Sequence, residues 1–371
     1  MCIRDRNIDR VPDLDPELKK RYIGEAKVLR AYNYYELYTK FGDVPYTTKV
    51  LSIKESMSIA RTAKATVIAN VLADLDEVIN GNYLPTSYDA DNKGRITRWA
   101  AMAIKAKIYL FEGNWTQVKN ITSTIMTEGG FKLFGSYAGL FEIANEYNSE
   151  VILDAQYRPT SREHQMMYVF LPPTLGGYSQ LSPLQELVDS YIMLDGKTIK
   201  ETGTSFDESH PYANRDPRLK ATVMYTGNSY TLADGTEVVI NCEKGEGKDG
   251  YGVGSDCSAT GYYIKKYWDN TYRATLYSGL NPILIRYADI LLMNAEALAE
   301  LGELDKTAWD ATIKPIRDRA GFTLASALEF PEGASKDKLI EIVRNERRSE
   351  LALEGHRHKA VSYTHLTLPT K

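Results

Sequence analysis

The sequence contains few of the residues on which catalytic and metal sites are commonly built. Of its 371 residues, 3 are cysteine and 5 are histidine. No two of Cys2, Cys242 and Cys257 have the C-x-x-C spacing of a zinc site or a thioredoxin-like motif. The signatures of nucleophile elbows, zincins, P-loops and dinucleotide-binding loops are missing as well. These absences leave the sequence without a catalytic or cofactor signature.

A basic excess and a long apolar run are also missing. Lys and Arg total 45 against 49 Asp and Glu, which gives a net charge of -4. Proteins that bind nucleic acid usually carry a basic excess or a basic stripe, so we expect no nucleic-acid partner. No uninterrupted apolar run approaches the roughly 18 residues of a membrane-spanning helix. The chain does not open with a signal peptide either, since no apolar stretch follows a basic segment there.

Both ends of the chain look foreign. Residues 1–6 and 361–371 do not continue the patterns beside them, and they resemble translated adapter sequence. We therefore leave them out of the fold prediction. Cys2 directly follows Met1, so it lacks the setting of a lipid-attachment cysteine. We expect the chain to be an internal fragment of a longer protein.

Tyrosine is unusually abundant. There are 26 Tyr against 9 Phe and 4 Trp, within an otherwise ordinary globular composition of 43% apolar and 25% charged residues. Tyr buries a flat apolar ring and keeps a hydroxyl for a polar partner. The excess suits a surface that binds sugars or peptides, and it equally suits a tyrosine-rich core and rim.

Helical periodicity dominates both ends of the sequence. Small residues alternate with large apolar ones in 97–111 and 283–301, and each of these segments leads through a short glycine-containing turn to another helix. This pattern predicts helical hairpins of the tetratricopeptide kind, which must stack to bury their faces. The predicted helices are 15–41, 62–79, 97–111, 115–127, 283–301, 306–319 and 336–355.

The middle of the chain is different. Residues 150–155 predict a short buried strand, and strand-like runs at 222–226 and 236–241 are separated by glycine-rich turns. Long irregular segments of this kind are usually functional. We predict a mainly α fold, in which tetratricopeptide-like hairpins support an irregular, loop-rich ligand-binding half with short strands. The expected domains are residues 7–130 and 150–360, packed as one unit.

Two features of the glycine-rich region leave alternatives open. Cys242 and Cys257 bracket this loop, and they are either a disulfide or two unpaired buried thiols. Asp249 and Asp256 are candidate calcium ligands, although the D-x-D-x-D-G spacing of a calcium loop is missing. No other cofactor is expected.

Charged residues gather in two further segments. Arg344 to Glu354 carries a dense alternation of Arg and Glu beside leucines, which indicates that part of the cluster is packed and paired inside the protein. The segment Arg215 to Leu219 combines an Asp suited to capping with two Arg. We interpret it as a structural clamp.

Six blocks in this order closely resemble the SusD/RagB family: LRAYNYYELYTKFGDVPYTTK, AIKAKIYLFEGNW, LQELVDSYIMLDGK, NRDPRLKATV, ILIRYADILLMNAEALAELG and ERRSELALEGHR. They lie within residues 25–358. The resemblance implies a surface-exposed lipoprotein of the outer membrane of Bacteroidetes-type bacteria, with tetratricopeptide-like hairpins. It implies capture of an oligosaccharide or another nutrient for a SusC-like TonB-dependent transporter, without catalysis. Its membrane association would depend on a lipid anchor that lies outside this sequence.

Two other functions stay open on the residues alone. One is an intracellular tetratricopeptide scaffold that binds peptides. The other is an all-helical glycosidase, whose paired carboxylates would be recognised only by their separation in space.

Sugar binding needs flat aromatic rings and planar polar side chains on loops carried by a rigid scaffold. Two stretches meet this description, one from Tyr157 to Tyr178 and one from Tyr262 to Tyr277, which also contains Lys265 and Arg273. The alternative is that these aromatics pack the loops onto the helices. The predicted ligand-binding residues are Tyr157, Arg158, His164, Tyr168, Tyr178, Tyr267, Trp268 and Asn270.

Overall fold

The computed structural model describes residues 7–272 and 276–365. The chain divides into two compact units, Met1–Gly130 with His358–Lys371, and Phe131–Arg357. The predicted foreign segment 1–6, the last six residues of the predicted foreign segment 361–371, and Arg273 of the second candidate stretch lie outside the described residues.

The first unit is helical, and its helices begin where the sequence predicts them. Asp15, Thr97 and Asn114 each cap a helix by accepting a hydrogen bond from a backbone N–H of its first turn. Four of its helices agree with the predicted ones to within two residues, and the helices Ile53–Ser58 and Arg357–His365 are additional. The elements are η1 (Ile8–Arg10), α2 (Pro16–Phe41), α3 (Ile53–Ser58), α4 (Lys64–Asn80), η2 (Ala90–Asn92), α5 (Arg98–Phe111), α6 (Trp115–Glu128) and α14 (Arg357–His365).

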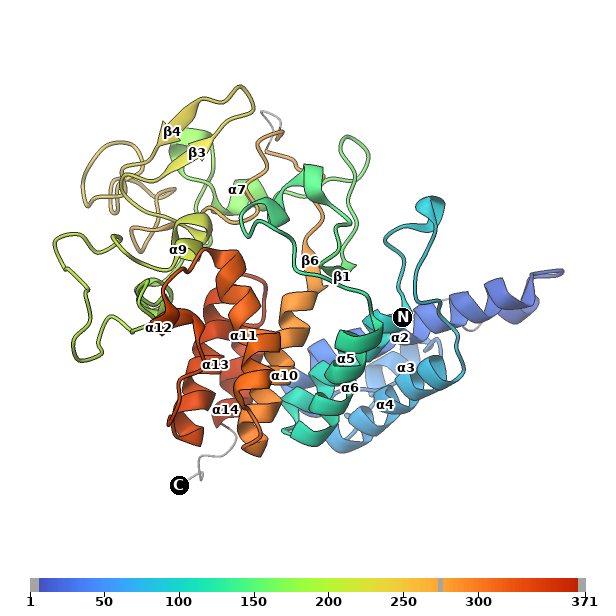
Figure 1. The fold of residues 1–371 in the computed structure, drawn as a ribbon. Coiled ribbons are helices and arrows are strands. Elements are labelled where there is room, and N and C mark those ends of the chain that lie inside the picture. The colour runs from blue at the N-terminus through green and yellow to red at the C-terminus, as the bar shows by residue number, and fades with distance from the viewer. Residues whose placement is uncertain (1–6, 273–275, 366–371) are drawn as a thin grey trace. The chain divides into compact units, whose positions relative to one another are not determined.

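Helix α5 is the centre of this unit and contacts α2, α4 and α6. Ala100, Ala103 and Ala106 are fully buried, so neighbouring helices approach its backbone closely. The predicted α5–α6 hairpin is therefore confirmed (Figure 1). On α2, Leu29 and Leu37 are exposed although both are apolar.

The second unit combines helices with short strands. Its elements are η3 (Gly139–Phe141), η4 (Ile143–Asn145), β1 (Val151–Asp154), α7 (Met166–Phe170), η5 (Pro173–Leu175), α8 (Gln185–Ser190), α9 (Pro217–Thr222), β2 (Val223–Met224), β3 (Ser229–Thr231), β4 (Glu237–Val239), β5 (Tyr263–Ile264), β6 (Ile283–Arg286), α10 (Tyr287–Leu301), α11 (Lys306–Ala320), α12 (Ala325–Leu328) and α13 (Lys336–Glu350). The strands form three two-stranded antiparallel sheets, β1–β6, β2–β5 and β3–β4. Helix α10 packs against α11 and α13, which confirms the second predicted hairpin (Figure 1).

Two of the predicted helices differ from the structure at one end. Residues Ile283–Arg286 form strand β6 instead of the first turn of a helix, and they pair with the predicted strand β1. Helix α13 ends at Glu350 instead of continuing to residue 355. The prediction of a mainly helical fold with short strands is confirmed.

Tyrosines build the core of the loop-rich part of the second unit. Tyr137, Tyr230, Tyr263 and Tyr267 are all buried in one apolar cluster. The Tyr230 hydroxyl donates to the carbonyl of Ile264 at 2.7 Å, and the other three hydroxyls likewise have polar partners. The interpretation of the tyrosine excess as core material therefore holds for this cluster.

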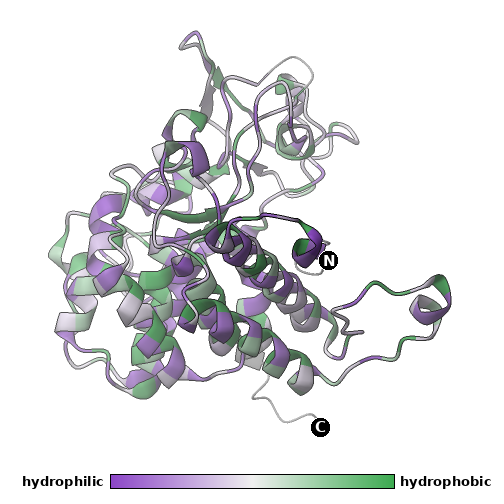
Figure 2. Cartoon of the chain, turned by 90° about the vertical axis from the view of Figure 1, so that its right-hand side faces the viewer, coloured by the Kyte–Doolittle hydropathy of each residue, from purple (hydrophilic) through white to green (hydrophobic). Residues whose placement is uncertain are grey.

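The two cysteines of the glycine-rich region are free thiols, with Cys242 buried and Cys257 half-buried. Hydrophobic and hydrophilic residues alternate along the helices (Figure 2). None of the described helices combines the length and the apolar character that crossing a lipid bilayer requires.

Candidate functional site

The first candidate stretch holds its aromatic residues against neighbouring loops. The Tyr157 and His164 rings meet edge to face with their centroids 4.6 Å apart. His164 Nε2 lies 2.8 Å from the carbonyl oxygen of Leu280, and Arg158 is exposed. Tyr157 and His164 thus fasten their loop to the segment that precedes β6, as the packing alternative predicts.

Tyr168 and Tyr178 form a separate surface pair. Their rings stack with centroids 4.2 Å apart, and Tyr178 is 40% exposed. Gly177 permits this arrangement, because a Cβ there would lie only 2.1 Å from the carbonyl oxygen of Leu171. The pair presents aromatic surface to solvent.

The second candidate stretch divides between core and surface. Tyr267 is 5% exposed and packs edge to face on Phe141, so its ring belongs to the core. Trp268 is half-buried, and its indole Nε1 donates to the carbonyl of Thr231 at 2.8 Å. Asn270 is exposed. The structure brings these three predicted residues together.

Tyr267, Trp268 and Asn270 line a cavity of about 590 Å³ within the second unit. A volume of this size is typical of small-molecule sites. The walls come from three parts of the chain: the η3–η4 segment, helix α9 with β3, and the loop after β5. The lining residues are Ala138, Phe141, Glu142, Ile143, Ala144, Pro217, Lys220, Ala221, Thr231, Lys265, Lys266, Tyr267, Trp268, Asp269, Asn270 and Thr271.

The lysine next to Tyr267 is anchored below this cavity. Lys266 is 2% exposed, and its ammonium donates to the Tyr137 hydroxyl at 3.0 Å and to the Glu354 carboxylate at 2.7 Å. It also lies 4.2 Å from the centroid of the Phe141 ring. Burial lowers the pKa of Lys266 to about 8, against the attraction of Glu354. The lysine therefore fixes the backbone that carries Tyr267 and Trp268.

Glu354 belongs to a larger buried ion network. Arg286 binds Glu354, Glu150 and Glu350 at 2.6–2.8 Å, and all four side chains are at most 1% exposed. Burial alone would raise the pKa of Glu354, but the charges of Arg286 and Lys266 outweigh it and lower that pKa to about 2. Arg218, one residue from the start of α9, joins the network through Glu346 at 2.6 Å and Glu350 at 2.8 Å.

This network unites the charged segments that the sequence separates. Arg218 comes from the predicted clamp, and Glu346, Glu350 and Glu354 come from the Arg/Glu cluster. The prediction that both are structural and partly internal is confirmed. Arg286 lies at the end of β6, so the network ties together strands, α9 and α13 beneath the cavity.

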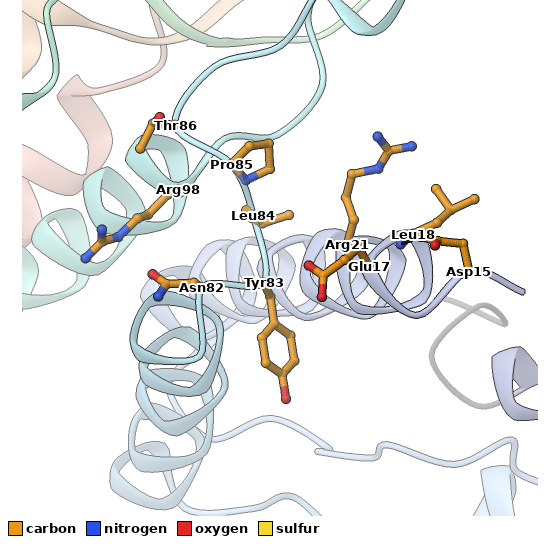
Figure 3. A pocket seen from close by; sticks show the side chains of 10 residues that line it. All are labelled: Asp15, Glu17, Leu18, Arg21, Asn82, Tyr83, Leu84, Pro85, Thr86 and Arg98. Carbon is orange, nitrogen blue, oxygen red and sulfur yellow. Dashed lines mark hydrogen bonds between the residues drawn. The ribbon is translucent and has the colours of Figure 1, made fainter.

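A second cavity, of about 480 Å³, lies in the first unit between the start of α2 and the segment after α4 (Figure 3). Among the described residues that line this cavity, Tyr83 is the aromatic one, and the Tyr83 ring points away from Arg21 (Figure 3). The Tyr83 hydroxyl donates to Glu77 at 2.9 Å, and Lys20 lies over the ring at 5.6 Å. Because this ring is already engaged, the cavity suits sugar stacking less well than the one beside Trp268.

The structure does not show a calcium site at Asp249 and Asp256. Asp249 is buried and accepts a hydrogen bond from the backbone N–H of Thr174 at 2.8 Å, whereas Asp256 is exposed. In the part of the chain that the structure describes, no three His, Cys, Asp or Glu side chains are grouped closely enough to hold a metal ion.

The cavity beside Trp268 therefore offers an aromatic face, a planar amide, hydroxyl groups and ammonium groups. Such groups bind a polyhydroxylated ligand without bond chemistry. Lys220 and Phe141 also line the cavity, and neither was predicted from the sequence. They lie 48 and 127 positions from Trp268 along the chain, so no local pattern indicates that all three line one cavity.

Models of known protein families match both parts of the chain. The model described as the SusD family matches residues 140–359, and a model described as starch-binding and associating with the outer membrane matches residues 6–110. A SusD-like protein of Formosa agariphila is 27% identical over 375 residues, which cover 95% of this chain and 65% of that protein. The chain thus spans less than two thirds of this relative.

Solved structures agree with these matches. A SusD-like carbohydrate-binding protein from Bacteroides fragilis is 27% identical with a TM-score of 0.86, over 98% of this chain and 71% of that one. A second SusD-like protein from the same species is 28% identical with a TM-score of 0.81, over 98% and 73%. Because the first family model covers more than half of the sequence, and because the folds agree, the chain belongs to the SusD family.

Proposed function

We propose that this chain binds an oligosaccharide in the cavity beside Trp268. The observation that carries the proposal is the half-buried indole on the wall of a 590 Å³ cavity, with the exposed Asn270 amide close by. A sugar ring presents an apolar C–H face that stacks on such a ring, and its hydroxyls bond to planar polar groups. The relative from Bacteroides fragilis, which is described as carbohydrate-binding, supports this class of ligand.

The proposal favours binding over catalysis. Two residues with a carboxylate line the cavity, Asp269 and Glu142. The Asp269 carboxylate accepts hydrogen bonds from the hydroxyls of Thr271 and Ser278. The remaining one, Glu142, is exposed and bonded to Asn145. A glycosidase would need two carboxyl groups that flank the scissile bond.

The proposal extends to the cellular setting. Membership of the SusD family and the match to a model described as associating with the outer membrane support a surface-exposed lipoprotein. There the protein would pass its ligand to a SusC-like TonB-dependent transporter. Both points can be tested by expressing the full-length gene in a Bacteroidetes host. Protease shaving of intact cells tests surface exposure, and affinity isolation tests association with the transporter. Recovery of the protein from the cytoplasm without a transporter would contradict them.

Calorimetry with a panel of oligosaccharides tests the binding site. Asn270→Ala removes an exposed amide, so we expect weaker binding at an unchanged melting temperature. Trp268→Ala should abolish binding, and it should also lower the melting temperature, because the indole packs on Tyr230 and bonds to Thr231. Tyr251→Ala, an exposed tyrosine outside the cavity, is the control.

Two outcomes would redirect the assignment. Loss of affinity in Tyr178→Ala alone would move the site to the Tyr168–Tyr178 surface pair. Release of reducing sugar from a bound polysaccharide would replace binding with glycoside hydrolysis. Unchanged affinity in Asn270→Ala and Trp268→Ala, measured with a ligand that binds the wild-type chain, would remove the cavity as the site.

A further inference from the structure

Besides the buried Lys266, two lysine side chains line the cavity beside Trp268. Lys220 lies on α9 and is exposed, and Lys265 directly follows β5 and is half-buried. Within the described residues, neither ammonium has a carboxylate at ion-pairing distance. Two ammonium groups without a carboxylate at ion-pairing distance are unusual in a cavity that would bind only neutral sugars, because each is costly to remove from water.

A buried amide holds these two lysines together. Asn228 is 2% exposed, and its Nδ2 donates to the carbonyl of Lys220 at 3.0 Å and to that of Val223 at 3.1 Å. Its Oδ1 accepts from the Lys265 ammonium at 3.1 Å. One rigid side chain thus fixes the backbone of the first lysine and the charged group of the second. Because Lys265 is already ordered in the free protein, ligand binding loses little further side-chain entropy there.

The nearby carboxylates already accept hydrogen bonds. Glu237 attracts both lysines from a distance and accepts from the hydroxyls of Ser229 and Thr231. Of the two carboxylates that line the cavity, Asp269 accepts from Thr271 and Ser278, and the exposed Glu142 accepts from Asn145. Burial and the neighbouring charge of Lys220 lower the pKa of Lys265, whereas Glu237 opposes them only in part. The two ammonium groups therefore repel each other, and an anion placed between them would relieve this repulsion.

We propose that the cavity selects acidic oligosaccharides, with a carboxylate or sulfate group bound between Lys220 and Lys265 while the sugar ring lies on Trp268. This inference rests on the proposed function and names the ligand class of the same site. Uronic acids and sulfate esters share the required chemistry, a compact anionic group on a sugar ring. Hydrogen bonds to charged groups are stronger than neutral ones, so we expect a preference of about 10- to 100-fold over a neutral sugar of equal length.

Calorimetry with three trisaccharides of matched length tests the inference: one neutral, one built of uronic acids and one carrying sulfate esters. The wild-type chain should bind at least one acidic trisaccharide more tightly than the neutral one, and the difference should shrink at high salt. Lys220→Gln should remove most of the preference without changing the melting temperature, because Lys220 is exposed. Lys265→Gln should also remove most of the preference, and Lys265→Arg should retain it.

Lys244→Gln is the matched control, because Lys244 is an exposed lysine outside the cavity. Its affinities should equal those of the wild type. Equal affinity for neutral and acidic trisaccharides, or an unchanged preference in Lys220→Gln, would overturn the inference while leaving the proposed function intact. If no trisaccharide binds and Asn270→Ala changes nothing with any longer oligosaccharide, the proposed function fails as well. Whether uronate or sulfate binds more tightly identifies the source of the anionic group.

Discussion

Removal of Arg286 is the sharpest test of the buried ion network. The guanidinium makes five hydrogen bonds, to the carboxylates of Glu150, Glu350 and Glu354 and to the backbone carbonyl of Glu350, at 2.6–2.8 Å. Arg286→Met keeps much of the apolar stem and removes the charge. Three buried carboxylates then lose a shared partner, while Arg218, Arg319 and Lys266 remain beside them.

The expected cost follows from the burial of these groups. Breaking a buried ion pair by removing one partner typically costs about 3–5 kcal/mol, since the remaining charge stays desolvated. For a compact unit of this size, such a loss lowers the melting temperature by about 6–20 °C. Arg61→Met is the control, because Arg61 is exposed and should change stability by less than about 0.5 kcal/mol.

Chemical denaturation followed by circular dichroism at several pH values measures the effect. Arg286 and Lys266 lower the pKa of Glu354 in the folded state to about 2 from the usual 4.5. The stabilisation linked to this carboxylate is therefore fully present above the unfolded value and is lost as the pH falls from 4.5 towards 2. The difference between wild type and Arg286→Met should be largest at neutral pH and should shrink in this acidic window.

A different pH profile would contradict the reasoning. If Arg286→Met unfolds at the same denaturant concentration as Arg61→Met at neutral pH, the network contributes little to stability. If the difference between wild type and Arg286→Met is constant down to strongly acidic pH, the loss arises from packing and not from unpaired carboxylates.

Two further predictions concern the loops. Gly177→Ala should lower the free energy of unfolding by about 1–3 kcal/mol and disturb the Tyr168–Tyr178 pair, because a Cβ at Gly177 would meet the carbonyl of Leu171 at 2.1 Å; near-ultraviolet circular dichroism should register the change. Gly135→Ala, with nothing within 4 Å of the new Cβ, should be tolerated, and equal melting temperatures for the two variants would refute the close approach. Burial raises the pKa of the Cys242 thiol to about 12, so Cys242 should react with a thiol reagent only after unfolding, whereas the half-buried Cys257 should react in the native state. In a Cys2→Ser background, Cys257→Ser should remove this native-state reaction and Cys242→Ser should leave it. The reverse result would contradict the burial of Cys242.

Local signals in the sequence were sufficient for most helices. Capping residues such as Asp15 and Thr97 and small-residue faces such as that of α5 act within a few positions, so the sequence displays them directly. The start of α10 was misjudged because Ile283–Arg286 is a short apolar run that periodicity alone cannot assign. Its strand conformation depends on pairing with β1, more than 120 residues earlier along the chain.

The cavity could be predicted only in part, for a similar reason. Tyr267, Trp268 and Asn270 are neighbours in sequence, so one aromatic and polar stretch identified all three as a group. Other lining residues, among them Lys220 and Phe141, come from distant segments of the chain. The same composition rule also selected Tyr157 and His164, whose rings pack a loop instead. Residue type alone does not distinguish a ring that packs a loop from one that faces a cavity.

The buried ion network of the second unit is distinct from the loop that carries Trp268 and Asn270. Arg218, Arg286 and Glu350 are fully internal, whereas Trp268 and Asn270 project from a loop anchored to them through Lys266. Replacement of residues 268–271, or of the exposed Lys220, leaves every member of the network in place. If the proposed function holds, exchange of these residues would alter the lining of the cavity while the buried charges of the second unit keep their partners.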